Sequence, residues 1–533
     1  MYSIKVFKIR FMKFNLYFLF IFLVFSTICF GQYGIKKNSE EALESYTLFE
    51  TTNTTYLIDN CGEIVNEWGV SRTDLHSKLL PNGNLLYIKD NLVYEVDWND
   101  NVVLITDHGQ PTLDLTYEVI VLPNGNYLCV ARRIRTSEFF TTLGYNPALG
   151  FPGLDDSVVE MVPETGQIVW EWNISDHIIQ DRNNTIANYG ILSENPQLLS
   201  VDAISTFDWE FNESFMINGM DYNADLDQIV LSIRKISEIV IIDHSTTTAQ
   251  AKESAGGRYG KGGDILYRWG NPQNYGQGSS ADRILYYQHN PNWIEYGEYE
   301  GMLIMHNNGL DRPGTSFNNR YSSAEIIEPV SDGNGNYTLV GGVQFFPNRA
   351  DKSYNRFTTG TEWYSGYTSS TKVLPNGNIY ITEGANDRYL EINPAGEVVW
   401  EYENQFGTYI FRSEKYSTSY AAFDNKVLQP NSTVEQPSST YNCTIFTTSI
   451  EDIQEASLNI NVQFDGENIL VNSGNEFQFS LMVYDMLGQN VAVDLKNKTK
   501  FTIPTENLNS GIYIVTAMSK EHNVITSHKV FVP

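Results

Sequence analysis

A short pattern built on Leu-Pro-Asn-Gly-Asn occurs three times and limits what this 533-residue chain can fold into. The copies read LLPNGNLLYI (79–88), VLPNGNYLCV (121–130) and VLPNGNIYIT (373–382). In each copy, Pro-Asn-Gly-Asn predicts a tight turn between two strands. A further strand, a turn and an apolar-aromatic strand follow, as in VVEMVPETGQIVWEW (158–172) and LEINPAGEVVWEY (390–402). Pro81 and Pro123 are 42 residues apart, which suits a four-stranded propeller blade of ~40–45 residues.

More divergent copies extend the pattern along the chain. YLIDNCGEIVNEW (56–68) precedes the first turn motif, and 214–234 and 299–306 read as blades whose turn sequence has drifted. We therefore expect an all-β fold, a propeller of about six blades with insertions at 133–155, 173–212 and 245–285. The copy at 56–68 is expected to pair with strands near 410–449 and close the ring. A chain of β-sandwiches is the alternative, but the repeated Trp-Glu-Trp or Trp-Glu-Tyr ending favours blades.

The two ends of the chain differ from this central region. A basic segment with Lys5, Lys8, Arg10 and Lys13 precedes the apolar run LYFLFIFLVFSTICF and Gly31-Gln32. This predicts a secretory signal peptide over 1–31, with cleavage before Gln32. A retained membrane helix is the rival interpretation, but the run is short and no second span follows. At the other end, 449–533 consists of short alternating strands with polar turns, which predicts a small β-sandwich. The propeller is expected over 32–448.

Charge and cysteine content limit the functional classes. The formal net charge is −29 and there is no basic stripe, so a nucleic-acid partner is not expected. A chain with 33 Tyr, 28 Phe and 9 Trp has enough apolar surface to fold. Removal of the signal peptide leaves Cys61, Cys129 and Cys443. One disulfide and one free thiol fit an oxidising compartment, and their spacing leaves the pairing open. No cysteine spacing indicates a metal site.

The stretch 267–325 carries the clearest chemical signal. Its two apolar runs, ILYY and MLIMH, have His289, His306, Asn307 and Arg312 at or near their ends. Strand ends can bring such side chains to one point. An imidazole and a guanidinium together suit an anionic ester, because one transfers a group or a proton and the other carries a fixed charge. His306 ends an apolar strand and is expected to be a core residue.

Several segments in order resemble the arylsulfotransferase family. They cover most of 45–415 and include EWNISDHIIQD (171–181), DWEFNESFMINGMDYNADLDQIVLSIR (208–234), GGRYGKGGDILYRWGNPQ (256–273) and IFR (410–412). The resemblance implies a six-bladed propeller whose site lies at the mouth of the central channel. It implies transfer of a sulfuryl group from an aryl sulfate to a phenol by a ping-pong route through a histidine, with no nucleotide, metal or other cofactor.

The family's site residues carry over only in part. The Gln-His motif is Gln288-His289, and the Asn-Gly…Arg motif is Asn308-Gly309…Arg312. Three stretches in which the family has histidines differ here and read Thr116-Tyr117-Glu118, Met216-Ile217-Asn218 and Tyr367-Thr368-Ser369. We therefore expect His289 and Arg312 as catalytic residues. The expected substrate-binding residues are Asn218, Tyr367, Tyr117, Asn308 and His76.

The tail resembles the sorting domain of the type IX secretion system. VYDMLGQ, LNSGIYIV and the terminal KVFV carry this resemblance. It implies the type IX secretion machinery as a partner, export across the outer membrane and removal of the tail. Secretion or cell-surface display is therefore expected, without a stable membrane span after processing. An ordinary carbohydrate-binding or immunoglobulin-like module is the alternative.

Three functional classes remain open. The first is a secreted enzyme that transfers sulfuryl groups from phenolic sulfates to phenols, and the second is an aryl sulfate hydrolase on the same scaffold. The third is a non-catalytic propeller that binds an aromatic or sulfated ligand. Retention of His289 and Arg312 favours the first class, whereas the replaced histidines favour the third.

Overall fold

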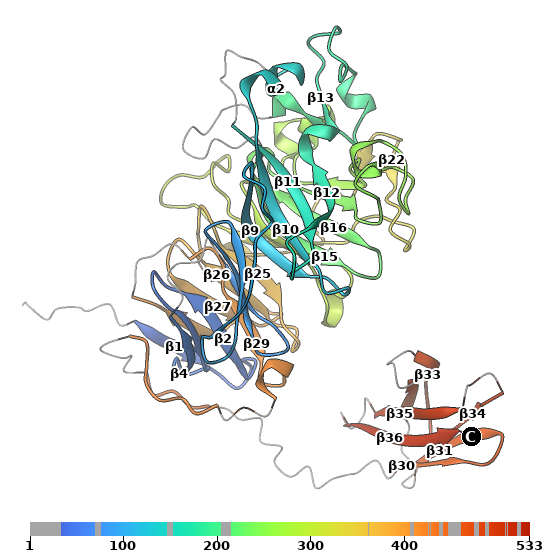
Figure 1. Ribbon diagram of the computed structural model, residues 1–533. Helices are drawn as coiled ribbons and strands as arrows, with labels where there is room; N and C mark the ends of the chain where they lie inside the picture. The colour runs from blue at the N-terminus through green and yellow to red at the C-terminus, as the bar shows by residue number, and fades with distance from the viewer. Residues whose placement is uncertain are drawn as a thin grey trace, which may run out of the picture. The chain divides into compact units, whose positions relative to one another are not determined.

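The computed structural model describes 33–69, 76–145, 153–203, 215–360, 362–405, 410–424, 426, 428–435, 441–445, 460–473, 479–484, 490–506, 508, 510–519 and 524–532. The predicted signal peptide (1–31) and the predicted boundary at 448/449 lie outside these residues. The chain divides into two compact units, Met1–Ile445 and Phe446–Pro533. Both consist of β-sheet, as expected from the sequence (Figure 1).

Six antiparallel sheets of four or five strands make up the described part of the first unit. The first two sheets follow the chain order and contain β5 (Ser77–Leu79), β6 (Leu85–Lys89), β7 (Leu92–Val96) and β8 (Val102–Thr106), then β9 (Leu113–Val121), β10 (Tyr127–Ile134), β11 (Leu154–Met161) and β12 (Ile168–Asn173). The next two contain β15 (Ile217–Asn223), β16 (Gln228–Ile233), β17 (Glu238–Asp243) and β18 (Tyr267–Trp269), then β19 (His289–Trp293), β20 (Leu303–Asn307), β21 (Ser323–Ile327) and β24 (Lys352–Asn355).

The last two sheets each combine strands from both ends of the unit. One contains β25 (Ser370–Val373), β26 (Ile379–Glu383), β27 (Arg388–Ile392), β28 (Val398–Glu403) and, paired with β28, β1 (Gly34–Asn38). The other contains β29 (Glu414–Ser417), β2 (Ser45–Glu50), β3 (Thr55–Ile58) and β4 (Ile64–Trp68). Figure 1 shows β2 beside β29, the blue start of the unit next to its orange end.

Smaller elements decorate these sheets. They are α2 (Ser137–Thr142), α3 (Arg356–Thr359), the parallel pair β13 (Ile178–Ile179) and β14 (Leu199–Ser200), and the antiparallel pair β22 (Leu339–Val340) and β23 (Gln344–Phe345). Across the part of the chain that the structure describes, no helix is long and apolar enough to cross a membrane.

Strands from the start and the end of the first unit pair with each other, as expected, but the divergent copy at 56–68 does not supply the strand that pairs. That copy spans β3 and β4, whereas β29 pairs with β2, the strand before it. The copy itself meets the later segment at the bridge between Glu63 and Thr433. A disulfide between Cys61 and Cys443 lies close to this bridge, and the remaining described cysteine, Cys129, is buried and free.

Each predicted Pro-Asn-Gly-Asn turn connects two paired strands, namely β5 to β6, β9 to β10 and β25 to β26. The turn glycine adopts a left-handed backbone in each copy, with φ of 87° at Gly83, 86° at Gly125 and 83° at Gly377. A side chain at this φ is unfavourable, which explains glycine in all three copies. The prediction of tight turns is confirmed.

Both asparagines of each turn donate to one glutamate of the same sheet. Oε1 of Glu95 accepts from Asn82 (3.2 Å) and Asn84 (2.6 Å). The equivalent acceptors in the other two copies are Glu160, which binds Asn124 and Asn126, and Glu391, which binds Asn376 and Asn378. The turn motif therefore recurs together with a carboxylate in the third strand of its sheet.

The second oxygen of each glutamate binds a side chain of the next sheet. Oε2 of Glu95 accepts from the Tyr127 hydroxyl at 3.0 Å. The other two pairs are Glu160 with His244 (3.1 Å) and Glu391 with Lys415 (2.7 Å). We call these three contacts the glutamate latches. Each one fastens a turn of one sheet to its neighbour, so the repeated motif also organises the packing of the sheets.

The edge strands β5, β9, β15, β19, β25 and β29 contact one another in sequence. Neighbours β9, β15, β19 and β25 touch directly. Charged pairs complete the circuit, since Lys78 of β5 meets Glu118 of β9 at 2.5 Å and Lys372 of β25 meets Glu414 of β29 at 3.7 Å. Glu414 also meets His76, next to β5, at 3.1 Å. These strands are therefore linked in one series of contacts.

The second unit contains two sheets over one shared core. One sheet is formed by β30 (Ile460–Phe464), β31 (Asn468–Ser473) and β34 (Lys500–Pro504). The other is formed by β33 (Asn490–Lys498), β32 (Phe479–Tyr484), β35 (Gly511–Ser519) and β36 (Val524–Val532). Val471 and Phe501 of the first sheet pack with Leu481 and Val515 of the second. This is the small sandwich that the sequence predicts.

Candidate active site

A left-handed backbone recurs in or just before four edge strands of the first unit. Tyr117, Met216, Tyr287 and Thr368 all have a left-handed backbone, with φ of 58°, 63°, 59° and 55°. They lie in β9 and just before β15, β19 and β25. A non-glycine residue in this region costs ~1–3 kcal/mol and such residues concentrate at functional sites. The recurrence therefore marks these strand ends as a candidate functional site.

His289 is the first residue of β19. Asn308 determines which nitrogen of the His289 imidazole carries the proton. The Nδ2 atom of Asn308 donates to the carbonyls of Ser365 (2.7 Å) and Thr368 (2.9 Å). Its Oδ1 atom therefore faces Nδ1 of His289, at 2.7 Å. An amide oxygen only accepts, so Nδ1 carries the proton and Nε2 carries the lone pair. Among the described residues, no hydrogen bond reaches Nε2.

The surroundings of His289 keep its imidazole neutral. Its side chain is 3% exposed, and burial, together with the charges of Arg234 and Arg412, holds its pKa well below the usual value. His306, its partner across the two strands, is fully buried, and burial lowers the pKa of His306 to about 3. The site therefore offers an uncharged nitrogen base next to fixed positive charges.

Aromatic rings form one side of this site. The ring of Phe411 lies 6.0 Å from that of His289 and 5.4 Å from that of Tyr117, between centroids. The Arg412 guanidinium lies 5.5 Å from the Phe411 ring centroid. The Nε and Nη2 atoms of Arg412 are buried and have no hydrogen-bond partner among the described residues. Buried donors normally have acceptors, so this geometry suits an anion with an aromatic substituent.

Arg312 follows Asn308 in a loop and is held by rings. Its guanidinium lies 4.3 Å from the centroid of Tyr321 and 5.2 Å from that of Tyr286. Nη2 donates to the hydroxyl of Ser323 at 3.3 Å, and Nε is buried with no partner. No carboxylate among the described residues forms an ion pair with it. Arg312 is therefore a cation without a carboxylate partner in the described part of the chain.

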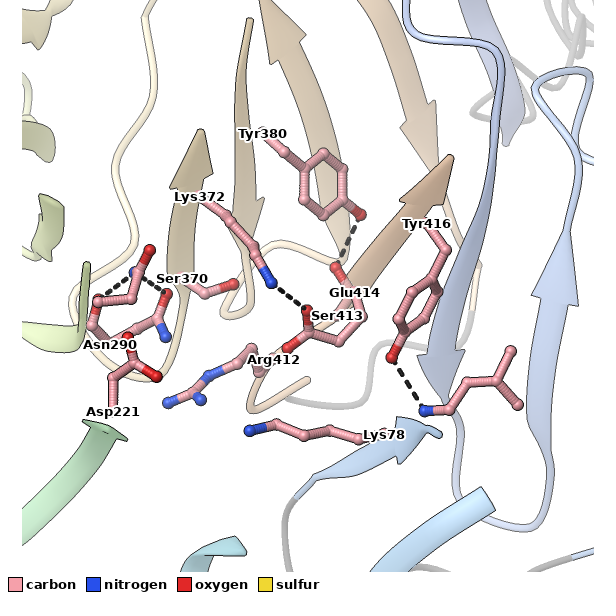
Figure 2. Close-up of polar contacts among 12 residues, drawn as sticks. Lys78, Asp221, Asn290, Ser370, Lys372, Tyr380, Arg412, Ser413, Glu414 and Tyr416 are labelled. Carbon is pink, nitrogen blue, oxygen red and sulfur yellow. Dashed lines mark hydrogen bonds and ion pairs between the residues drawn. The ribbon is translucent and has the colours of Figure 1, made fainter. Parts of the chain in front are cut away.

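A charged network extends from Arg412 along the edge strands, and Figure 2 shows its members Lys78, Arg412 and Glu414. Glu118 accepts from both Arg412 and Lys78, and it lies 3.6 Å from Nδ1 of His76. Burial alone would raise the pKa of Glu118, but Arg412 and Lys78 hold it well below its usual value. His76 joins this carboxylate to Glu414, so β5, β9 and β29 are tied together by charge. The network fixes Arg412 in place.

Figure 2 also shows Asp221 on the side toward which Lys78 and Arg412 point. The Asp221 carboxylate accepts from the backbone N–H of Trp293 at 2.9 Å. Burial raises its pKa to about 6, although Lys78 and Lys372 act in the opposite direction. Asp221 thus lies in the same circuit of charges without a direct ion pair.

The structure brings several of the expected site residues together. Asn308 binds His289 directly, and Asn218 donates to the carbonyl of Gln288, the residue before it, at 2.9 Å. Tyr117 reaches His289 through Phe411. These contacts place the residues, while their roles in chemistry stay predictions.

The contacts of the other expected residues are with groups other than His289. His76 belongs to the charged network, where it binds two carboxylates. Tyr367 is 45% exposed, and its carbonyl accepts from the hydroxyl of Ser365. Arg312 packs on Tyr286 and Tyr321. His306 is a core residue, as its position at the end of an apolar strand predicts.

Sequence reasoning missed three residues around His289, namely Arg234, Phe411 and Arg412. Arg234 lies 4.9 Å from the centroid of Tyr287, and its Nη1 contacts the sulfur of Met216 at 3.8 Å. Both arginines and Phe411 occur in segments, 208–234 and 410–412, whose overall pattern is informative. Nothing in either segment singles out these side chains, because their proximity to His289 depends on the folded sheets.

No group of three or more His, Cys, Asp or Glu residues suited to a metal ion occurs in the described ranges. The polar groups around His289 are the Asn308 amide and the guanidiniums of Arg234 and Arg412. This donor set suits an oxyanion.

Comparison with protein families gives two matches along the chain. The family model described as Arylsulfotransferase (ASST) matches 31–424, and the model of the secretion system C-terminal sorting domain matches 455–532. The sorting domain marks the protein for export, to the cell surface or the medium. No curated protein matches the chain.

Solved structures match the chain at low identity and low TM-score. A streptogramin B lyase structure is 9% identical with a TM-score of 0.31, and the match covers 68% of this chain and 76% of that one. Hydrazine synthase from Kuenenia stuttgartiensis is 12% identical with a TM-score of 0.31 and the same two coverages. PorZ, a surface component of the type IX secretion system of Porphyromonas gingivalis, is 9% identical with a TM-score of 0.20, covering 94% and 75%.

The family match spans all six sheets of the first unit, from β1 to β29. It includes His289, Asn308, Arg234 and Arg412. It therefore covers the whole scaffold that positions the candidate site. The expectation drawn from the ordered sequence segments is confirmed, and the chain belongs to the arylsulfotransferase family.

Proposed function

We propose that this protein transfers a sulfuryl group from a phenolic sulfate ester to a phenol, with His289 as the nucleophile. The observation that carries the proposal is the state of this imidazole. Asn308 directs the proton to Nδ1, burial and two guanidiniums keep the ring neutral, and Nε2 keeps its lone pair. A neutral imidazole with a fixed tautomer is an activated nucleophile at pH 7.

In the first step, Nε2 attacks sulfur, the S–N bond forms and the bond from sulfur to the aryl oxygen breaks. The electron pair of that bond leaves with the phenoxide, which takes a proton from water. The ring becomes an N-sulfonated imidazolium, whose Nδ1–H remains bonded to Oδ1 of Asn308. This hydrogen bond strengthens as charge develops on the ring.

In the second step, the acceptor phenol loses its proton to water and attacks sulfur. The S–N bond breaks and its electron pair returns to Nε2, which restores the neutral imidazole. The overall reaction converts an aryl sulfate and a phenol into a phenol and a new aryl sulfate. Neither step needs a nucleotide or a redox partner.

The orphan donors of two arginines supply the binding of the sulfonate oxygens. Nε of Arg312 and Nε and Nη2 of Arg412 are buried without acceptors. Guanidinium donors aimed at oxygens that gain charge stabilise the transition state, and removal of one such donor typically costs ~10²–10³ in rate. Asn218, Tyr367, Tyr117 and His76 are proposed as neutral or more distant contributors to substrate binding.

A non-catalytic protein that binds aryl sulfates is the second candidate. One stretch of the sequence favours this candidate. Where the family has histidines, this chain has Thr116-Tyr117-Glu118. Here Glu118 is occupied by Arg412, Lys78 and His76. Such a protein would hold the ester through the same arginines without attacking it.

The test is incubation of the purified first unit, with its disulfide intact, with 4-nitrophenyl sulfate in the presence and absence of phenol. Transfer predicts nitrophenol release that depends on phenol, and peptide mass spectrometry without phenol should find one added SO₃ group on the peptide containing His289. Release that is independent of phenol would indicate hydrolysis. Binding of the ester without any release would establish the second candidate.

We also infer that the six sheets are the blades of one closed propeller whose first blade is completed by β29. The circuit of contacts among the six edge strands and the pairing of β2 with β29 support this count. Export is inferred to use the signal peptide and the type IX secretion machinery, followed by removal of both ends. Mass spectrometry of extracellular protein should then find Gln32 at the N-terminus and no peptides from 449–533.

A further inference from the structure

Guanidinium groups and aromatic rings alternate along one continuous path beside the candidate active site. Arg283 lies 5.7 Å from the ring centroid of Tyr287 and 4.5 Å from that of Tyr286. Arg312 follows, 5.2 Å from Tyr286 and 4.3 Å from Tyr321. We call these five residues, together with Phe357, the arginine–aromatic ladder.

One end of the ladder lies next to His289 and the other end is exposed. Tyr287 is two residues before His289, and Tyr286 donates its backbone N–H to Asn307, the neighbour of Asn308. At the far end, the ring of Phe357 meets that of Tyr321 edge-on at 5.0 Å and is 71% exposed. The Tyr287 ring also lies 4.9 Å from Arg234, whose charge acts on His289, so the path runs from this neighbourhood to the surface.

The two arginines of the ladder form no ion pair with a described carboxylate, although the chain as a whole is rich in acidic residues. The sequence has 64 acidic and 35 basic residues, and arginines elsewhere pair with them, as Arg133 does with Glu171 and Arg388 with Glu401. Within the described residues, neither Arg283 nor Arg312 has a carboxylate at ion-pair distance. Arg283 donates to the carbonyl of Leu285 and the hydroxyl of Ser237 instead.

A guanidinium held by aromatic faces stays charged and available to a planar anion. The ladder supplies two such cations and four rings in one row. A ligand that matches it has flat rings and more than one negative group. The exposure of Phe357 leaves room for a ligand that is longer than a single ring.

We propose that the ladder is a second substrate subsite, which binds a further aromatic ring and a further anionic group of an extended aryl sulfate. This rests on the proposed function, because the first sulfate is taken to lie at His289. The subsite selects polycyclic or polyphenolic sulfates with two negative groups over a single sulfated ring. Arg283 is its specificity-determining cation, and Tyr321 and Phe357 contact the second ring.

Binding of aryl sulfonates tests the subsite separately from catalysis, because their C–S bond is not transferred. Calorimetry on the purified first unit would compare benzenesulfonate with biphenyl-4,4′-disulfonate. We expect the disulfonate to bind at least about tenfold more tightly, the gain of one desolvated ion contact. Arg283→Met should remove most of this gain and leave the affinity for benzenesulfonate within about twofold.

Phe357→Ala is the second variant, because an exposed ring can be removed without loss of folding. It should weaken the disulfonate by several-fold and leave benzenesulfonate unchanged. Arg258→Met is the matched control, since Arg258 lies 5.7 Å from the ring of Tyr259, outside the ladder, and should change neither affinity. Equal affinities for the two probes in the wild type, or equal losses for both in Arg283→Met, would overturn the subsite. The proposed transfer reaction would be untouched by that result.

Discussion

His244 and His289 lie in the same unit, in surroundings of opposite charge. His244 is placed between Asp227 (2.7 Å) and Glu160 (3.1 Å), and although burial opposes it, these carboxylates raise its pKa to about 9. His289 is buried near Arg234 and Arg412, and its pKa is well below the usual value. One histidine is therefore a cation at pH 7 and the other is a free base.

This difference in charge distinguishes contacts that hold the sheets together from groups that are available to a ligand. In the glutamate latches, every donor meets a carboxylate, so the charge is used within the chain to fasten sheets. At the candidate active site, Arg312 meets rings and a hydroxyl, and its Nε has no acceptor. Buried donors without acceptors lower the stability of the fold. Such donors are expected where an anion binds and supplies the acceptor. The latches should therefore govern stability and the site should govern activity.

His289→Ala gives the largest effect and tests whether the site is separate from stability. Phenol-dependent release of nitrophenol should fall by more than ~10³-fold because the nucleophile is lost. The thermal midpoint should stay close to that of the wild type, since the imidazole makes one hydrogen bond. Retained activity in this variant would remove His289 from the mechanism.

Glu391→Gln tests the opposite half of the comparison. It leaves the Lys415 ammonium, which is fully buried, without its carboxylate. Breaking a buried ion pair in this way typically costs ~3–5 kcal/mol, measurable as a lower urea midpoint with the disulfide intact. Lys415→Met with Glu391→Gln is the control and should recover part of the loss. The rate per folded molecule should not change in either variant.

Arg312→Met keeps the stem that packs on Tyr321 and removes the charge. We expect the transfer rate to fall by ~10²–10³, with a small change in stability. Arg258→Met serves as the control for a surface arginine that also lies on a tyrosine. If stability fell and the rate per folded molecule did not, Arg312 would belong with the latches.

The pH dependence of stability sharpens the comparison at His244. Its pKa is raised from 6.5 to about 9 on folding, so its contribution is complete below pH 6.5 and is lost as the pH rises through 9. A shift of this size corresponds to roughly 3 kcal/mol. The unfolding midpoint of the wild type should fall between pH 7 and 10, and that of His244→Gln should be lower at pH 6 and flatter. An equally steep fall in the variant would assign the effect to other groups.

Glu95→Gln is expected to have the smallest effect. Its partner in the next sheet is the neutral hydroxyl of Tyr127, and an amide oxygen can still accept one of the Asn donors. We expect a loss of ~1 kcal/mol or less in unfolding free energy. A loss as large as that of Glu391→Gln would show that the latches do not depend on the charge of the donor.

The sequence predicted those features that are encoded locally. Pro-Asn-Gly-Asn specifies its turn within four residues, so the strand pairs and their repetition could be read directly. The Gln-His and Asn-Gly motifs likewise identified His289 and Asn308 as candidate site residues, and the structure brings the two into contact. The latch glutamates Glu160 and Glu391 occur in the two quoted repeats at 158–172 and 390–402. The latch partners are a tyrosine, a histidine and a lysine, so no shared pattern identified them.

Contacts between distant segments could not be predicted in the same way. Arg412 and Glu118 are 294 residues apart, and Cys61 and Cys443 are 382 apart. Each meets its partner only because sheets that are far apart in the chain become neighbours. The positive surroundings of His289 belong to this class, since Arg234 and Arg412 come from two different sheets.

The bond between Cys61 and Cys443 makes most of the first unit a covalent ring. A single break in the backbone anywhere between these residues opens the ring without releasing a fragment. A protease in the medium that cuts one exposed loop would therefore leave the two pieces attached by a covalent bond as well as by the shared sheets. On a gel, such nicked protein would run as one species until a reducing agent is added, and only then as two.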